Sequence, residues 1–218
     1  MEDNLTYIKS KKGEIKSAFI DSNKPDFSKL KQLSKELGYI IYSVPEETEV
    51  EFNNDGWLVK ATGNSKDIWQ FIKGWAMPYD CFINGFPFPV KMEQMWNSDK
   101  SVKQVDVEEL KWNLKFPWWN TEEDIPYNLR PEDVMLDINK YFYHKEKIER
   151  SEIKYPLLLV QTKQNRWLIY DGVHRFVKQI LEGEDKVFCQ KFSLSEIKEY
   201  IPEDYQKLFD EWLNLEYK

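Results

Sequence analysis

The chain has 218 residues, of which 41% are hydrophobic and 16% aromatic, so it is expected to bury one sizeable core or two small ones. Its 38 acidic and 31 basic residues give a net charge of −7, which disfavours long DNA as a partner because affinity for phosphate backbones comes from Lys and Arg. The absence of a membrane-length apolar run and of a signal-peptide pattern predicts a cytoplasmic location.

The first half alternates helical and strand patterns, which predicts a small α/β unit. Leu30, Leu33 and Leu37 repeat at helical spacing and predict a helix over residues 26–37 with Asp26 or Ser28 near its N-cap. The other expected elements are a strand over 38–44, a hairpin of 50–52 and 57–61, a helix over 65–75 and a strand over 79–83.

A polar stretch at 97–102 is the expected linker, which predicts an N-terminal domain over 1–98 and a C-terminal domain over 103–218. Two interpretations of the aromatic cluster beyond it stay open. It can be a hydrophobic plug between the halves, or a stacking platform for a base or sugar with Trp118 and Trp119 at the substrate end. The cluster consists of Trp112, Phe116, Pro117, Trp118 and Trp119.

The second half shows both strand and helix patterns. Lys145, Lys147 and Arg150 are interleaved with Glu, which is typical of a solvated helix end rather than of a basic patch. The expected elements are strands over 155–160 and 166–170, a helix capped by Gly183, and a strand over 186–189.

One motif between these elements contains residues suited to binding an anion. An apolar strand ending at Tyr170 runs into the turn Asp171-Gly172, and the helix that follows opens with Val173, His174 and Arg175. A helix start leaves backbone N–H groups unpaired and carries the positive end of the macrodipole, so an anion is favoured there. Arg175 adds a charged fork, and His174 a donor that titrates near neutral pH. The structural alternative is a common Asp-Gly turn, with Gly172 at positive φ and two solvated side chains.

This strand, turn and helix resemble the ParB/sulfiredoxin superfamily, whose signature is a Gly-containing turn and an (E/H)R pair opening a helix that faces a nucleotide phosphate. The resemblance spans about residues 105–200 and implies an α+β fold with a mixed sheet and helices, beside a smaller α/β N-terminal half. It also implies a first strand over 105–110, a polar loop over 127–131 and a helix over 132–143. Val173 stands where sulfiredoxins place Cys, so their thiol chemistry is not implied. The nearest branch is the free-serine kinases, whose Asp-Gly-His-His-Arg turn this chain matches except at the first His.

The resemblance implies that ATP or a related nucleotide binds with Mg²⁺ and that its terminal phosphate is transferred, as by a small-molecule kinase, or hydrolysed. The implied nucleotide-binding residues are Gly172, Val173, His174, Arg175 and Arg130. The candidate catalytic residues are His174, Asp171 and Asp133, with Asp171 also the candidate metal ligand.

Structural alternatives stand beside these roles. Asp171 can hold the turn by bonding backbone amides, and Asp133 can be a first-turn carboxylate favoured by the helix dipole. At the level of function, the alternatives are a nucleotide-dependent binding module without turnover and a ParB-like nuclease, which the acidic balance disfavours. The acceptor of the phosphate is left unspecified.

Overall fold

The computed structural model describes residues 4–9, 15–20, 26–38, 40–45, 47–62, 67–121 and 127–216. These residues form a mixed α+β protein with two compact units, Met1–Pro89 together with Asp204–Lys218, and Val90–Glu203. The division falls at Pro89 rather than in the expected linker at 97–102, which lies inside the second unit. Within the described ranges, none of the helices combines the length and apolar character needed to cross a bilayer.

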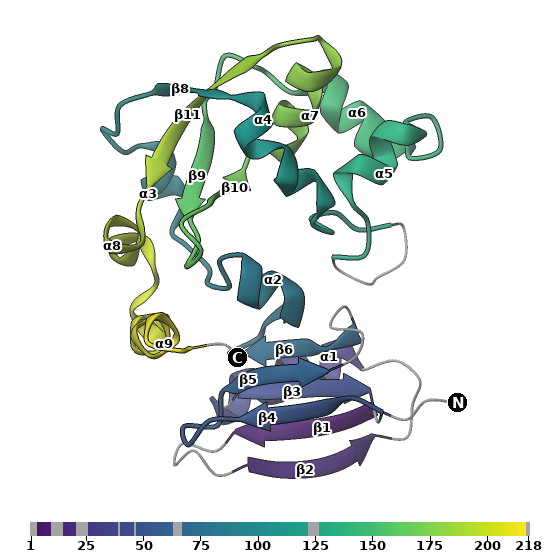
Figure 1. The fold of residues 1–218 in the computed structure, drawn as a ribbon, viewed down its shortest axis with the longest axis vertical. Helices are drawn as coiled ribbons and strands as arrows, with labels where there is room; N and C mark the ends of the chain where they lie inside the picture. The colour runs from purple at the N-terminus through teal and green to yellow at the C-terminus, as the bar shows by residue number, and fades with distance from the viewer. Residues whose placement is uncertain are drawn as a thin grey trace. The chain divides into compact units, whose positions relative to one another are not determined.

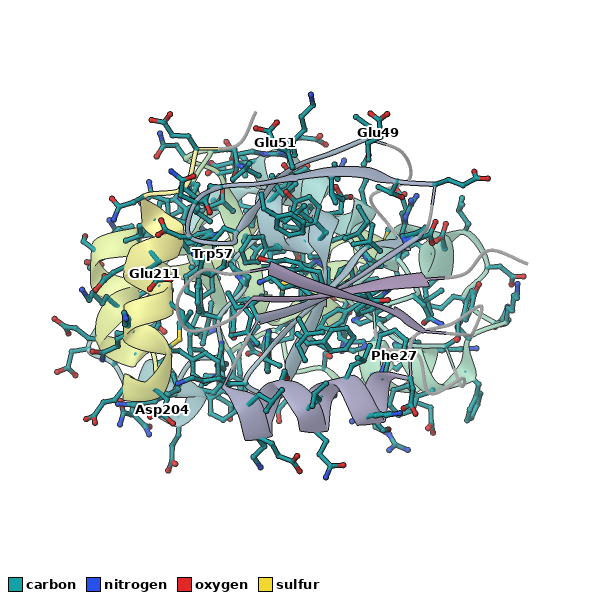
Figure 2. The ribbon with its side chains drawn as sticks, turned by 90° about the horizontal axis from the view of Figure 1, so that it is seen from below. Phe27, Glu49, Glu51, Trp57, Asp204 and Glu211 are labelled. Carbon is teal, nitrogen blue, oxygen red and sulfur yellow. The ribbon has the colours of Figure 1, made fainter. Side chains whose placement is uncertain are left out.

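The first unit is built on an antiparallel sheet with strand order β2-β1-β3-β6-β7. The sheet strands are β1 (Asn4–Lys9), β2 (Ile15–Ile20), β3 (Ile40–Pro45), β6 (Trp69–Ile72) and β7 (Trp75–Pro78). Helix α1 (Phe27–Leu37) covers one face, where the Phe27 ring lies 4.6 Å from that of Trp69. The hairpin of β4 (Glu49–Phe52) and β5 (Leu58–Thr62) covers the other, and Figure 2 shows the labelled Phe27 and Glu49 on opposite sides of the sheet.

Helix α9 (Glu203–Leu213) is the last helix that the structure describes, yet from Asp204 onward it belongs to the first unit. Its Phe209 and Trp212 are fully buried, and both rings lie 5.5 Å from that of Phe88. The Trp57 indole donates to the Glu211 carboxylate at 3.2 Å, and the two residues lie close together in Figure 2. This apolar face of α9 explains why the C-terminal segment returns to the first unit.

Three of the predicted elements of this unit are confirmed: helix α1, strand β3 and the β4–β5 hairpin. Asp26 is the N-cap of α1 and accepts from the Lys29 amide at 3.0 Å.

The helix predicted over 65–75 is wrong where the structure describes it; residues 63–66 lie outside the described ranges. The segment forms strands β6 and β7, joined by Lys73 and Gly74 at φ 48° and 83°. All four residues of β6 are buried, because this strand is covered on both faces. A strand without polar alternation imitates helical spacing.

The strand predicted over 79–83 is also wrong, because α2 (Tyr79–Asn84) begins directly after Pro78. Its helical geometry brings Tyr79 and Phe82 to one side, where their rings stack at 6.2 Å. Buried apolar residues in a run this short do not distinguish a strand from a helix.

The second unit is built on a mixed sheet with strand order β10-β9-β11-β8 (Figure 1). Its strands are β8 (Lys103–Asp106), β9 (Leu157–Gln161), β10 (Trp167–Asp171) and β11 (Lys186–Phe192). The pair β9–β11 is parallel and the other two pairs are antiparallel. Around the sheet lie α3 (Met92–Trp96), α4 (Val107–Leu110), α5 (Pro131–Leu136), α6 (Phe142–Arg150), α7 (Val173–Leu181) and α8 (Leu194–Ile197), with 3-10 helices η2 (Lys111–Lys115) and η3 (Lys198–Tyr200).

One face of this sheet and the helices α4 to α7 share a hydrophobic core. Leu157, Leu159 and Ile169 of the strands and Phe176 and Val177 of α7 are fully buried within it. Helix α7 connects β10 to β11, which pairs in parallel with β9, and this packing holds the first turn of α7 at the end of β10. The strands predicted for 155–160, 166–170 and 186–189 and the helix capped by Gly183 are thus confirmed.

Two predictions in this unit are wrong. The strand predicted over 105–110 ends at Asp106, and α4 follows with the Val107 amide donating to the Asp185 carbonyl at 2.9 Å. The helix predicted over 132–143 is two helices, α5 and α6, because Asp137 leaves the helical conformation at φ −144° and ψ 72°. Asp and Asn are weak helix formers, and Asp137 and Asn139 interrupt the pattern there.

Candidate functional site

The turn after β10 requires a glycine. Gly172 adopts φ 102°, a conformation that disfavours any side chain. A Cβ atom built on it would lie 2.7 Å from Leu157 Cδ2 and 2.8 Å from Arg175 Nη2. The β9–β10 ladder also shifts register between Ile169 and Asp171, so the strand kinks where it enters the turn. The predicted positive φ of Gly172 is confirmed, and close packing adds a second reason for it.

Arg175 braces this turn from within. Its Nη2 donates to Asp171 Oδ2 at 2.7 Å and to the Pro156 carbonyl at 3.3 Å, tying the end of β10 to the residue before β9. Among the described residues, no acceptor bonds its buried Nε. Asp171 therefore holds the turn through its ion pair with Arg175, in addition to any contact it makes with a ligand.

The two histidines of the chain meet at the start of α7. His144 Nδ1 lies 3.1 Å from His174 Nε2, and His144 Nε2 lies 2.9 Å from the Asn120 carbonyl oxygen. The Trp119 ring stacks on both imidazoles, at 4.6 Å from His144 and 4.3 Å from His174. His144 is in the first turn of α6, and the Lys178 ammonium of α7 bonds the Glu149 and Ser151 carbonyls where α6 ends. These contacts hold the two helices, and hence the two rings, together.

Sequence reasoning missed His144. The available signal was the low number of histidines: a chain with two histidines in 218 residues can form one histidine pair, which would join His144 to His174. The separation of thirty residues gave no local pattern that links them.

The pair opens into a pocket of about 600 Å³. The lining residues that the structure describes are Trp118, Trp119, Asn120, Thr121, Tyr143, His144 and His174. The two tryptophans predicted to lie at a substrate end do line this pocket. Two other members of the aromatic cluster are not among these lining residues. The Phe116 ring stacks on that of Trp118, with the ring centres 5.4 Å apart, and the Arg166 guanidinium lies over the Trp112 ring at 3.7 Å from its centre.

Burial keeps both imidazoles uncharged. Desolvation, followed by electrostatic coupling to His144, Lys147 and Arg175, lowers the pKa of His174 to about 4, and Asp171 opposes this shift. Desolvation also lowers the pKa of His144, against the raising effect of its bond to the Asn120 carbonyl. At neutral pH the site therefore presents neutral rings, and the pKa of His174 lies below the near-neutral range expected for it from the sequence.

Asn113 joins the pocket wall to β10. Its fully buried amide donates to the Leu110 carbonyl at 2.9 Å and to the Trp167 carbonyl at 3.2 Å, and accepts from the Ile169 amide at 2.8 Å. Its backbone carbonyl accepts from the Trp118 indole at 3.0 Å. Since β10 is an edge strand, the Asn113 side chain supplies the partners that another strand would give.

The other predicted site residues lie outside this set of lining residues. Arg130 is the residue before α5, and its Nη1 lies 3.3 Å from Glu132 Oε1. Asp133 sits in the first turn of α5, where the helix dipole favours a carboxylate. The structure thus brings His174 into the pocket and joins Asp171 to Arg175, whereas the ion pair described for Arg130 is with its neighbour Glu132.

The surroundings of Asp171 do not suit a protein-held metal. One of its oxygens is bonded by the Arg175 guanidinium at 2.7 Å. Among the described residues, no three His, Cys, Asp or Glu side chains gather as metal ligands would. The two cysteines, Cys81 and Cys189, are both buried and free.

Comparison with protein-family models, with curated proteins and with solved structures found no match for the chain.

Proposed function

We propose that the second unit is a ParB/sulfiredoxin-like domain that binds ATP or a related nucleotide in the two-histidine pocket and transfers or hydrolyses its terminal phosphate. The observation that carries this proposal is the pair of uncharged imidazoles at the start of α7, inside a pocket with aromatic walls. A neutral imidazole held in place is able to orient a hydroxyl group or a water molecule and take its proton, which is one of the parts that phosphoryl transfer needs beside electrostatic stabilisation of the phosphate.

The pocket is suited to a nucleotide in size and in lining. A volume of about 600 Å³ falls in the range of small-molecule sites, and the rings of Trp118 and Tyr143 offer faces for a base. Helix α7 contributes the partial positive charge of its N-terminus. The positive charges of Lys147 and Arg175 also act on His174, so the local electrostatic field favours an anion.

In the proposed reaction, the acceptor hydroxyl attacks the terminal phosphorus and gives its proton to His174. The new oxygen–phosphorus bond forms as the bond to the leaving nucleoside diphosphate breaks, and water replaces the acceptor in hydrolysis. Asp171, Gly172 and Arg175 shape the turn that presents the backbone of Val173 and His174. Mg²⁺ enters this scheme with the nucleotide phosphates, whose charge it neutralises. The reaction is assigned to the cytoplasm, with a small molecule or a protein as acceptor.

Nucleotide binding is tested by thermal shift and calorimetry on the whole chain, with ATP, ADP, GTP and CTP, each with and without Mg²⁺. Bound ligand raises the unfolding midpoint by mass action. A matched pair of variants locates the site: Tyr143 and Tyr155 are exposed by 59% and 53%, and each has a lysine ammonium near its ring. We expect Tyr143→Ala to weaken binding about tenfold, as loss of a stacking ring does, and Tyr155→Ala to leave it unchanged. A chain whose midpoint moves with none of the nucleotides would contradict the proposal.

One observation favours a second candidate, a binding module without turnover. The Nη2 group of Arg175 is engaged by Asp171 and Pro156, so these two acceptors compete with a transferring phosphate for the guanidinium in this conformation. Measurable nucleotide affinity, with no ADP or phosphate released over a panel of hydroxyl compounds, would select this candidate over the enzyme.

A further inference from the structure

The contacts of the histidine pair determine where its protons are. A carbonyl oxygen only accepts hydrogen bonds, so His144 must donate from Nε2 to Asn120. A neutral imidazole carries one N–H, which leaves His144 Nδ1 as an acceptor. His174 Nε2, which lies 3.1 Å away, must then be the donor of the bond between the rings. The remaining nitrogen, His174 Nδ1, carries no proton.

We infer that the Asn120 carbonyl, acting through His144, fixes the tautomer of His174 and makes its Nδ1 the basic atom of the site. His144 is accordingly a positioning residue for His174. This inference rests on the proposed function for its chemical use, but the tautomers themselves follow from the contacts alone. A hydrogen bond made by one ring nitrogen commonly fixes the protonation of the other.

Packing supports this arrangement. The two imidazole planes are nearly parallel, at 13°, and Trp119 lies against both at 13° and 16°. A ring held flat against an indole cannot turn freely to exchange its nitrogens. Among the described residues, no hydrogen bond involves His174 Nδ1. The lone pair of this nitrogen is therefore not used by another described residue, and His174 itself lines the pocket.

In the proposed reaction, the acceptor hydroxyl loses its proton to His174 Nδ1 as its oxygen bonds to phosphorus and the leaving diphosphate departs. The ring becomes an imidazolium that still donates from Nε2 to His144. The hydrogen-bonded chain from His174 through His144 to the Asn120 carbonyl, here called the relay, is therefore kept during the step. The proton then passes to solvent as the products leave. Without the relay, Nε2 and Nδ1 compete for the proton, and part of the molecules present an N–H where a base is needed.

The scarcity of histidine makes the inference directly measurable. With histidine labelled by ¹⁵N, the whole chain shows two imidazoles, and long-range proton–nitrogen spectra separate protonated from bare ring nitrogens. We expect both rings in the Nε2–H form at neutral pH. An Nδ1–H form of either ring would overturn the inference, whatever ligand the pocket binds.

Two variants at the positioning residue extend the test. His144→Gln keeps an oxygen to accept from His174 and an amide to donate to Asn120, whereas His144→Phe keeps the ring but has neither group. We expect His174 to stay in the Nε2–H form in the Gln variant and to show mixed tautomers in the Phe variant. An unchanged tautomer in a folded Phe variant would show that His144 has no positioning role.

The same variants separate this inference from the proposed function. If nucleotide is turned over, kcat falls about tenfold or more in His144→Phe with little change in KM, and His144→Gln restores most of it. If no nucleotide binds while the tautomers are as expected, the proposed function fails and the inferred relay stands. Turnover with reversed tautomers would instead support the proposed function and overturn the relay.

Discussion

The buried amide of Asn113 offers a sharp test of how the site is held. We consider Asn113→Leu, which keeps the branching and the number of side-chain heavy atoms of the amide and deletes its donor and acceptor. The change removes two bonds to carbonyl groups and one from the Ile169 amide. It leaves that amide and the Trp167 carbonyl without their partner at the edge of the sheet.

The expected magnitude follows from these three bonds. A net hydrogen bond contributes about 1 kcal/mol, and a buried donor left without a partner costs about 1–3 kcal/mol. Asn113→Leu should therefore lower the free energy of unfolding by about 3 kcal/mol. This is a large share of the ~5–15 kcal/mol that stabilises a typical domain.

Urea unfolding followed by circular dichroism measures the change, and with a slope of about 2 kcal/mol per M the midpoint should fall by roughly 1.5 M. Amide hydrogen exchange at Ile169 should accelerate as well. Asn139→Leu is the matched control, since Asn139 is exposed in the same unit and bonds one lysine. A loss below about 1 kcal/mol in Asn113→Leu, or an equal loss in the control, would refute the view that this side chain completes the edge of β10.

Three further predictions concern the turn and its histidine. Gly172→Ala should lower the free energy of unfolding by about 1–2 kcal/mol because of the positive φ, and further because the added Cβ clashes with Leu157. Gly183 has φ 82° and no atom within 4 Å of a Cβ built on it, so Gly183→Ala should show the first cost alone. Thermal melts compare the two variants. The pKa of His174 is about 4 in the folded chain and 6.5 in the unfolded chain, so the unfolded chain takes up the proton first as the pH falls. The free energy of unfolding should therefore fall by up to about 3 kcal/mol between pH 6.5 and 4. Urea titrations at each pH measure this dependence, and His174→Gln should reduce it. Arg175→Ala should destabilise the protein by about 1–3 kcal/mol through the loss of its bonds to Asp171 and to the Pro156 carbonyl before β9. Arg175→Lys should not restore both bonds. Equal unfolding midpoints for Arg175→Ala and the unsubstituted chain would contradict the view that Arg175 stabilises the turn.

Local signals predicted the core of the second unit well. Strands β9 and β10, helix α7 and the return strand β11 each carry their own apolar pattern, and Gly172 and Gly183 mark the turns by their conformational freedom. Where the same approach failed, burial on two faces removed the alternation that separates strand from helix. Strand β6 is the clear example, because all four of its residues are buried.

The sequence by itself determined the turn at the end of β10 and the identity of the residues that open α7, because a tight turn and a helix start depend on neighbours within a few positions. Only the tertiary structure decided which side chains those residues meet. The packing of α6 against α7 brings His144 to His174 across thirty residues, and the i, i+4 geometry of the first turn sends Arg175 back to Asp171 rather than toward the pocket. Such meetings depend on where whole elements pack, which no local pattern encodes, and here they determine which ring nitrogen is free to act as a base.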